Sequence, residues 1–184
     1  MSIAYAWSDL LPKDEPMAEG PNHPPLPPGH GLHPPAGELE VSQLEERLGV
    51  SLPPSYRQFL LFSDGWGVEE YSLWPVAEVG WLRDVWPSTV EAWTSPRDEE
   101  RPSVPDDLYF VYGKEQNSHD IRNEYLPDTL LVGQWDGDLL LNPHVTTSDG
   151  EWEAWLLAAW MPGANRHRSF WDLMKDLCTP RRRL

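Results

Sequence analysis

The sequence predicts a single domain that combines helices with a set of strands. Two short amphipathic segments with helix-start and helix-stop residues come first, within residues 41–62. From residue 70 onward the pattern changes to short apolar runs bounded by Gly, Pro, Asn and Asp, which is typical of strands and turns. One more amphipathic helix is predicted close to the C-terminus. At 184 residues the chain is of ordinary size for one domain with its own core.

Capping residues set the bounds of the predicted helices. In residues 41–48 the apolar side chains are spaced by three and four, and Gly49 follows as a helix stop. The next helix is predicted to begin at Pro53-Pro54, because the first helical position does not need an N–H donor. Ser169 is predicted to cap the last helix, with Asp172 at the third helical position.

A hairpin is the clearest feature of the predicted strands. The Asp136-Gly137 pair lies between two apolar runs, and glycine accepts the positive φ that tight turns require. Residues 152–160 fit helical and strand periodicity equally well, so this segment is either a helix or a strand. The predicted strands are Tyr71–Trp74, Leu108–Tyr112, Thr129–Gln134, Asp138–Asn142 and Trp152–Trp160, the last with a helix as the alternative.

The charge of the chain narrows the classes of partner. Lys and Arg number 14 against 30 Asp and Glu, which gives a formal net charge of −16. Such a field repels phosphate backbones and anionic lipid surfaces, so neither nucleic acid nor a membrane is expected as a partner. The single cysteine, Cys178, allows no intrachain disulfide, and the first residues do not form a secretory signal. We therefore expect a cytoplasmic protein, of unknown oligomeric state.

Proline content divides the chain into three parts. Residues 1–36 hold nine of the 20 prolines and are predicted to form an extended N-terminal arm. The folded domain is expected to span residues 37–179, and residues 180–184 form a basic tail. Four apolar residues of the arm are candidates for packing on the domain: Tyr5, Trp7, Leu10 and Leu11.

No catalytic motif is found in the sequence. The nucleophile elbow, the phosphate-binding loop and the dinucleotide fingerprint are all missing. Cys178 lies beside an apolar helix, where an inert buried thiol is expected. We therefore predict no catalytic residue and no cofactor; an enzyme that uses Glu115, His119 and Asp120 is the least favoured hypothesis.

A metal site is not predicted either. His23, His30 and His33 are close in sequence, but they lie in a segment too rich in proline to present a fixed geometry. Asp136 and Asp138 lack the further oxygen ligands of a calcium loop, which favours a simple turn.

The 11 tryptophans are the least ordinary feature of the composition. Trp152, Trp155, Trp160 and Trp171 are expected in the core. The tryptophans near turns are divided between core and contact surface: Trp66, Trp81, Trp86, Trp93 and Trp135. Aromatic anchors ringed by carboxylates suit recognition of a basic protein surface. The predicted partner-binding residues are Trp66, Glu69, Glu70, Trp135, Asp136 and Asp138.

Four segments of the domain resemble the SUKH superfamily, which includes fungal regulators of cell-wall synthesis and bacterial immunity proteins. Leu44–Leu60 is similar to the opening helix pair of the family, with its Leu-Pro step. Ser63–Gly67 lies where the family has a glycine turn, although Asp64 replaces the usual Asn. Leu130–Asn142 resembles the family's hairpin, and Ser169–Leu173 resembles its terminal Ser-Phe helix.

This resemblance implies a fold and a function. The implied fold class is α+β, with helices packed on one twisted, mostly antiparallel sheet, a C-terminal helix, and Trp152–Trp160 as a late strand. The implied function is that of a non-catalytic bacterial immunity protein, which binds and neutralises a cognate toxin domain such as a nuclease. The net charge of −16 adds the expectation that the toxin presents a basic surface. The alternative is a regulatory or scaffold protein of the same fold that binds a cellular partner.

Overall fold

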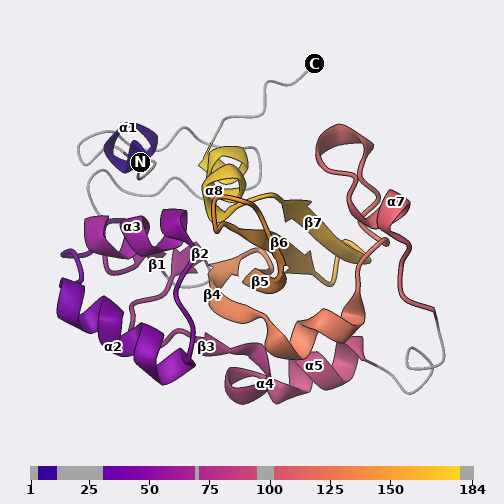
Figure 1. Ribbon diagram of the computed structural model, residues 1–184, viewed down its shortest axis with the longest axis horizontal. Coiled ribbons are helices and arrows are strands. Elements are labelled where there is room, and N and C mark those ends of the chain that lie inside the picture. The colour runs from indigo at the N-terminus through magenta and orange to yellow at the C-terminus, as the bar shows by residue number, and fades with distance from the viewer. Residues whose placement is uncertain (1–3, 12–30, 69–70, 95–101, 179–184) are drawn as a thin grey trace.

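An antiparallel sheet of seven strands runs through the middle of the molecule (Figure 1). The computed structural model describes residues 4–11, 31–68, 71–94 and 102–178. The strand order is β1-β2-β4-β5-β6-β7, and the short β3 pairs with β4. The strands are β1 (Trp66–Val68), β2 (Tyr71–Leu73), β3 (Gly80–Trp81), β4 (Leu130–Trp135), β5 (Asp138–Thr146), β6 (Trp152–Ala158) and β7 (Gly163–His167).

Helices surround this sheet, and most of them are short. In Figure 1, α2 and α3 lie together at one side, α4 and α5 follow one another along a second side, and α8 lies against β6. The predicted α+β fold with a C-terminal helix is confirmed. The helices are α1 (Trp7–Leu10), α2 (Glu38–Leu48), α3 (Pro54–Phe62), α4 (Leu82–Val85), α5 (Pro87–Trp93), α7 (Asp106–Tyr109) and α8 (Phe170–Cys178), with 3-10 helices η1 (Gly113–Glu115) and η2 (Asn123–Asp128).

The helix ends are made by the capping residues that the sequence indicates. Gly49 follows α2 with a left-handed φ of 72°. At the other end of α2 the side chain of Glu40 accepts a hydrogen bond from the backbone N–H of Gly37, at 2.7 Å. Ser169 Oγ accepts a hydrogen bond from the N–H of Asp172 at 3.1 Å, which caps α8 as predicted.

Both faces of the sheet are buried. One face carries Leu130 and Val132 of β4 and packs on α2, α3 and α8. The opposite face carries Leu131 and packs on α4, α7 and η2. All seven residues of β6 are consequently buried, so exposed and buried side chains do not alternate along this strand. This double burial explains why periodicity alone left Trp152–Trp160 open; the segment is a strand, and it ends at Ala158.

Both edges of the sheet are also occupied. At β1, Leu32 forms a bridge with Trp66, and the N–H of Gly67 donates to the carbonyl of Gly31 at 2.6 Å. At β7, the N–H of Ala164 donates to the carbonyl of Ser118 at 3.0 Å. The described chain therefore covers the unpaired backbone groups through which edge strands recruit further strands.

The beginning of the chain packs on the domain. Trp7 is buried, with its ring centroid 4.7 Å from that of Trp171, and Leu11 is buried in the same core. The hydroxyl of Tyr5 donates to Glu151 at 2.5 Å. Residues 12–30 of the predicted arm, with most of its prolines, lie outside the described residues.

The prediction of a strand at Leu108–Tyr112 is wrong. Residues 106–109 form the short helix α7. Pro105 precedes it with an extended conformation, and Asp106 and Asp107 occupy its first turn, where carboxylates stabilise a helix N-terminus. The helical turn carries Tyr109 into the core, while its neighbours Leu108 and Phe110 are exposed.

A buried ion pair fastens this α7 segment to the sheet. Glu153 of β6 and Arg166 of β7 are both fully enclosed, with 3.4 Å between Oε1 and Nη1. Arg166 also donates to the backbone carbonyls of Tyr109 and Val111. Four more side chains donate to the Glu153 carboxylate, at 2.6 to 3.0 Å: Tyr109, Tyr112, Asn142 and Trp155. The Glu153 carboxylate thus accepts hydrogen bonds from five side chains, as a buried carboxylate requires.

Replacing Glu153 by Gln tests this arrangement. The variant keeps the shape of the side chain but leaves Arg166 buried without a counter-charge, so we expect the free energy of unfolding to fall by about 3 kcal/mol. Urea denaturation measures the change. Glu46→Gln, at an exposed position of α2, is the control and should change stability by less than about 0.5 kcal/mol. A loss below about 1 kcal/mol in Glu153→Gln would contradict the structural role.

Candidate functional site

Two of the six predicted partner-binding residues are in the core. Trp66 and Trp135 are buried, and their rings stack with centroids 5.0 Å apart. The segment that covers the β1 edge shields Trp66, since a Cβ on Gly31 would lie only 2.2 Å from its Nε1. This burial corrects their assignment to a contact surface. Glu69 and Glu70 lie outside the described residues.

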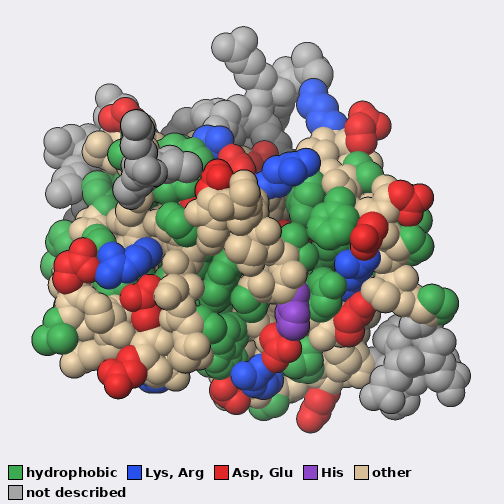
Figure 2. All heavy atoms as spheres, viewed as in Figure 1, with side chains coloured by type: hydrophobic (Ala, Val, Ile, Leu, Met, Phe, Trp, Pro, Cys, Tyr) green, Lys and Arg blue, Asp and Glu red, His purple; other side chains and the backbone are tan. Residues whose placement is uncertain are grey.

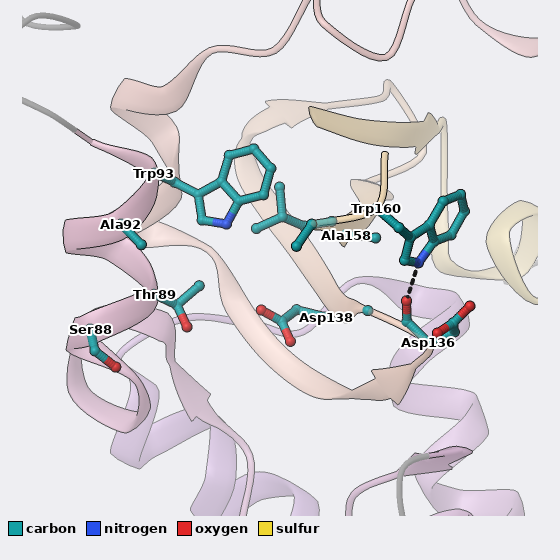
Figure 3. A pocket seen from close by; sticks show the side chains of 11 residues that line it. Ser88, Thr89, Ala92, Trp93, Asp136, Asp138, Ala158 and Trp160 are labelled. Atoms are coloured by element: carbon teal, nitrogen blue, oxygen red, sulfur yellow. Dashed lines mark hydrogen bonds between the residues drawn. The ribbon is translucent and has the colours of Figure 1, made fainter. Parts of the chain in front are cut away.

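The other two, Asp136 and Asp138, lie together at a pocket. This pocket has a volume of about 400 Å³ and lies between the β4–β5 turn, α5 and the end of β6 (Figure 3). Figure 2 shows acidic side chains scattered over one face of the molecule, with apolar area between them, and not gathered in one patch. The residues that line the pocket are Ser88, Thr89, Ala92, Trp93, Asp136, Gly137, Asp138, Leu157, Ala158, Ala159 and Trp160.

The β4–β5 turn is formed by a backbone hydrogen bond, a residue in the left-handed conformation and a close approach of two backbones. The N–H of Trp135 donates to the carbonyl of Gly137 at 2.7 Å. Asp136, and not the glycine, takes the left-handed conformation, with a φ of 54°. Gly137 is needed for a different reason, because a Cβ there would lie 2.6 Å from the carbonyl oxygen of Leu157. The predicted hairpin is confirmed, with Gln134 opposite Asp138 in the register.

Asp138 is a half-buried carboxylate that points toward α5, whereas the side chain of Asp136 points away from it (Figure 3). Burial raises the pKa of Asp138 to about 6, and a hydrogen bond with Gln134 acts in the opposite direction. Within the described ranges no basic side chain forms an ion pair with it. At neutral pH the pocket therefore holds a negative charge that is partly desolvated and has no counter-charge from the described chain.

Trp160 corrects a second prediction, because it is 62% exposed and not in the core. Its indole Nε1 donates to the backbone carbonyl of Asp136 at 2.7 Å, which holds the ring at the rim of the pocket. Since β6 ends at Ala158, Trp160 lies in the turn to β7. The following Pro162-Gly163, a turn signal, is the sequence feature that could have placed it there.

Trp93 of α5 is the second aromatic residue of the site. It is half-buried, lines the pocket, and belongs to the side of the sheet that also holds Trp86 and Val90. In Figure 3 the Asp138 carboxylate points toward α5, which carries Trp93, while the indole of Trp160 lies on the other side of Ala158, next to Asp136. The sequence left Trp93 between core and contact surface; in the structure it packs against the core and also lines the pocket.

The three residues named in the enzyme hypothesis do not lie at the pocket described above. Glu115 and His119 are exposed, and neither they nor Asp120 line the pocket. Burial raises the pKa of the Cys178 thiol to about 12, so it is not an ionised nucleophile at neutral pH. Among the described residues no group of three potential metal ligands is found, and His23 and His30 are not among them.

The chemistry of the pocket suits binding. The Asp138 carboxylate points toward α5, and the indoles of Trp93 and Trp160 form part of the lining. Apart from Asp136, whose side chain points away, the remaining lining side chains are small, apolar or hydroxylated. A negative charge beside aromatic faces attracts a cation that carries apolar groups. The pocket contains neither a nucleophile with a neighbouring base nor a second carboxylate aimed at the first.

Comparison with known proteins identifies the family. The model of the SMI1/KNR4 family (SUKH-1) matches residues 35–175. The chain belongs to this family. The match confirms the resemblance seen in the four sequence segments, and membership is consistent with a toxin-immunity role. No curated protein and no solved structure matches the chain. None of the helices in the described ranges has the length and apolar character needed to cross a membrane.

The raised pKa of Asp138 predicts a pH-dependent cost in stability. Because the folded protein binds this proton more tightly than the unfolded chain, the free energy of unfolding falls as pH rises from about 4 to about 6. Asp138→Asn removes that cost. At pH 8 the variant should be more stable than the parent by about 1 kcal/mol, an amount that allows for the partial solvent exposure of Asp138. At pH 4 the two proteins should be equally stable.

Urea denaturation at the two pH values measures this difference. Asp136→Asn, at the exposed position of the same turn, is the matched control and should show no comparable gain between pH 4 and pH 8. If Asp138→Asn is destabilised at pH 8, or differs from the parent equally at both pH values, the environment assigned to Asp138 is wrong.

Proposed function

We propose that this protein is a non-catalytic bacterial immunity protein of the SUKH type, which acts in the cytoplasm by binding a cognate toxin domain. The match of the SMI1/KNR4 family (SUKH-1) over residues 35–175 carries the proposal. A binding pocket without a catalytic constellation supports it. On this proposal the protein neutralises the toxin by covering it.

The occupied edges of the sheet limit where such a partner binds. Because both edges are occupied by the protein's own chain, a partner is not recruited by adding a strand. The turns at the end of the sheet remain, and the β4–β5 turn carries Asp136 and Asp138. Glu69 and Glu70, which the structure does not describe, stay part of the proposed contact surface on the sequence argument alone.

The charge of the chain favours a basic partner. A net charge of −16 attracts a positively charged protein and speeds its encounter. Nuclease domains require a basic cleft for their substrate, so an acidic inhibitor complements them. A toxin with such a cleft is the proposed partner.

Co-expression with the toxin encoded next to this gene tests the proposed function. We expect the full chain to restore growth of cells that produce the toxin, and the two purified proteins to elute together from size exclusion. A catalytically inactive toxin serves as the control for toxicity. Unchanged killing, together with separate elution, would show that the proposed function is wrong.

Reversing the two turn charges tests the proposed contact surface. Asp136→Lys with Asp138→Lys should lower the association rate constant with the toxin about tenfold at low salt and flatten its salt dependence, because electrostatic steering is lost. Stopped-flow or surface plasmon resonance measures the rate. Glu46→Lys with Glu78→Lys makes the same change in net charge at exposed positions outside the pocket. Equal rates for the two double variants would remove the turn from the interface.

A further inference from the structure

We infer that the pocket binds an arginine side chain of the protein partner, with the guanidinium held between the Asp138 carboxylate and the indole rings of Trp93 and Trp160. This inference rests on the proposed function, which makes the partner a protein, and it names the group that the site recognises. Asp138, Trp93 and Trp160 all line this pocket (Figure 3).

The first argument is the charge that the described chain leaves without a counter-ion. Asp138 is half-buried and has Gln134 as its hydrogen-bond partner, so it is partly desolvated while ionised. Glu153, on the neighbouring strand, instead has a buried arginine and four neutral donors. A guanidinium entering the pocket supplies Asp138 with both the positive charge and the N–H donors that it lacks.

The second argument is the exposed aromatic surface. Trp160 is 62% exposed, yet the hydrogen bond from its Nε1 to the Asp136 carbonyl fixes the ring. A ring held in place before binding loses little conformational entropy when a partner covers it. Cations are attracted to indole faces, and the stem of an arginine is apolar enough to cover them.

The third argument selects arginine over other cations. A planar guanidinium can stack on an indole while it donates to a carboxylate, which the compact ammonium of lysine does less well. The fold contains a comparable pairing on a phenol ring, since the guanidinium carbon of Arg166 lies 4.2 Å from the ring centroid of Tyr109 while Arg166 pairs with Glu153. A metal ion is disfavoured because the described residues contain no cluster of ligands for one.

Asp138 and Asp136 are the titratable residues among those that line the pocket. The lining residues of α5 are Ser88, Thr89, Ala92 and Trp93, and those at the end of β6 and the turn after it are apolar or aromatic. Because the Asp136 side chain points away, protonation of Asp138 alone is expected to remove the attraction for a cation. Binding should therefore weaken as the pH falls from 7 to 5.

A blocked tripeptide, acetyl-Gly-Arg-Gly-amide, is the probe for this site. Its titration into the ¹⁵N-labelled full chain at pH 7 should shift the indole N–H signals of Trp93 and Trp160 in a saturable way. Single Trp→Phe variants assign these two signals. We expect a dissociation constant of about 1–10 mM, as for one charged side chain against an aromatic wall.

Three comparisons make the titration decisive. The citrulline peptide, which has the same shape without the charge, should leave the indole signals unshifted, and the lysine peptide should bind at least threefold more weakly. Asp138→Asn should weaken binding of the arginine peptide at least tenfold, and pH 5 should weaken it severalfold in the parent. Equal shifts with citrulline, equal affinity for lysine, full affinity in Asp138→Asn, or no shift at all would each overturn the inference.

This outcome is separable from that of the proposed function. If the peptide does not bind while the full chain still restores growth against the toxin, the pocket assignment is wrong and the immunity function stands. If the peptide binds but the chain neither protects cells nor forms a complex with the toxin, the proposed function is wrong. The citrulline and lysine comparisons need no variant, so they hold even if Asp138→Asn folds poorly.

Discussion

Burial of the sheet on both faces and at both edges is the constraint on which the rest of the structure depends. Helices cover the two faces, and the segments around residues 31–33 and 116–118 cover the two edges. Such a sheet cannot recruit a partner strand or expose an apolar face. On the proposed function, recognition falls to the turns and short helices at the rim of the sheet, where the pocket lies.

Two carboxylates on adjacent strands have opposite effects on stability. Glu153 is enclosed and surrounded by donors, so its charge holds the α7 segment on the sheet. Asp138 is half-buried with Gln134 beside it, so its charge costs stability in the free protein. Proteins keep such a cost where a binding site needs it, because the missing partner group is supplied by the ligand. The difference between the two environments is the physical basis for assigning the pocket to binding.

Features set by local chemistry could be predicted from the sequence, and features set by tertiary packing could not. Gly49, the cap at Ser169 and the Asp136-Gly137 hairpin act within a few residues, and all three were predicted correctly. The site was predicted only in part. The sequence places Asp136 and Asp138 beside the turn, and both line the candidate pocket. The burial of Trp66 and the exposure of Trp160 depend on the packing of segments distant in sequence, which the sequence pattern does not give.

The structure of the complex with the toxin tests the central claim most directly. It should show the β4–β5 turn and Trp160 covered by the toxin, with an arginine of the toxin within hydrogen-bond distance of the Asp138 carboxylate. A complex in which the toxin contacts another face and leaves the pocket open to solvent would contradict the account.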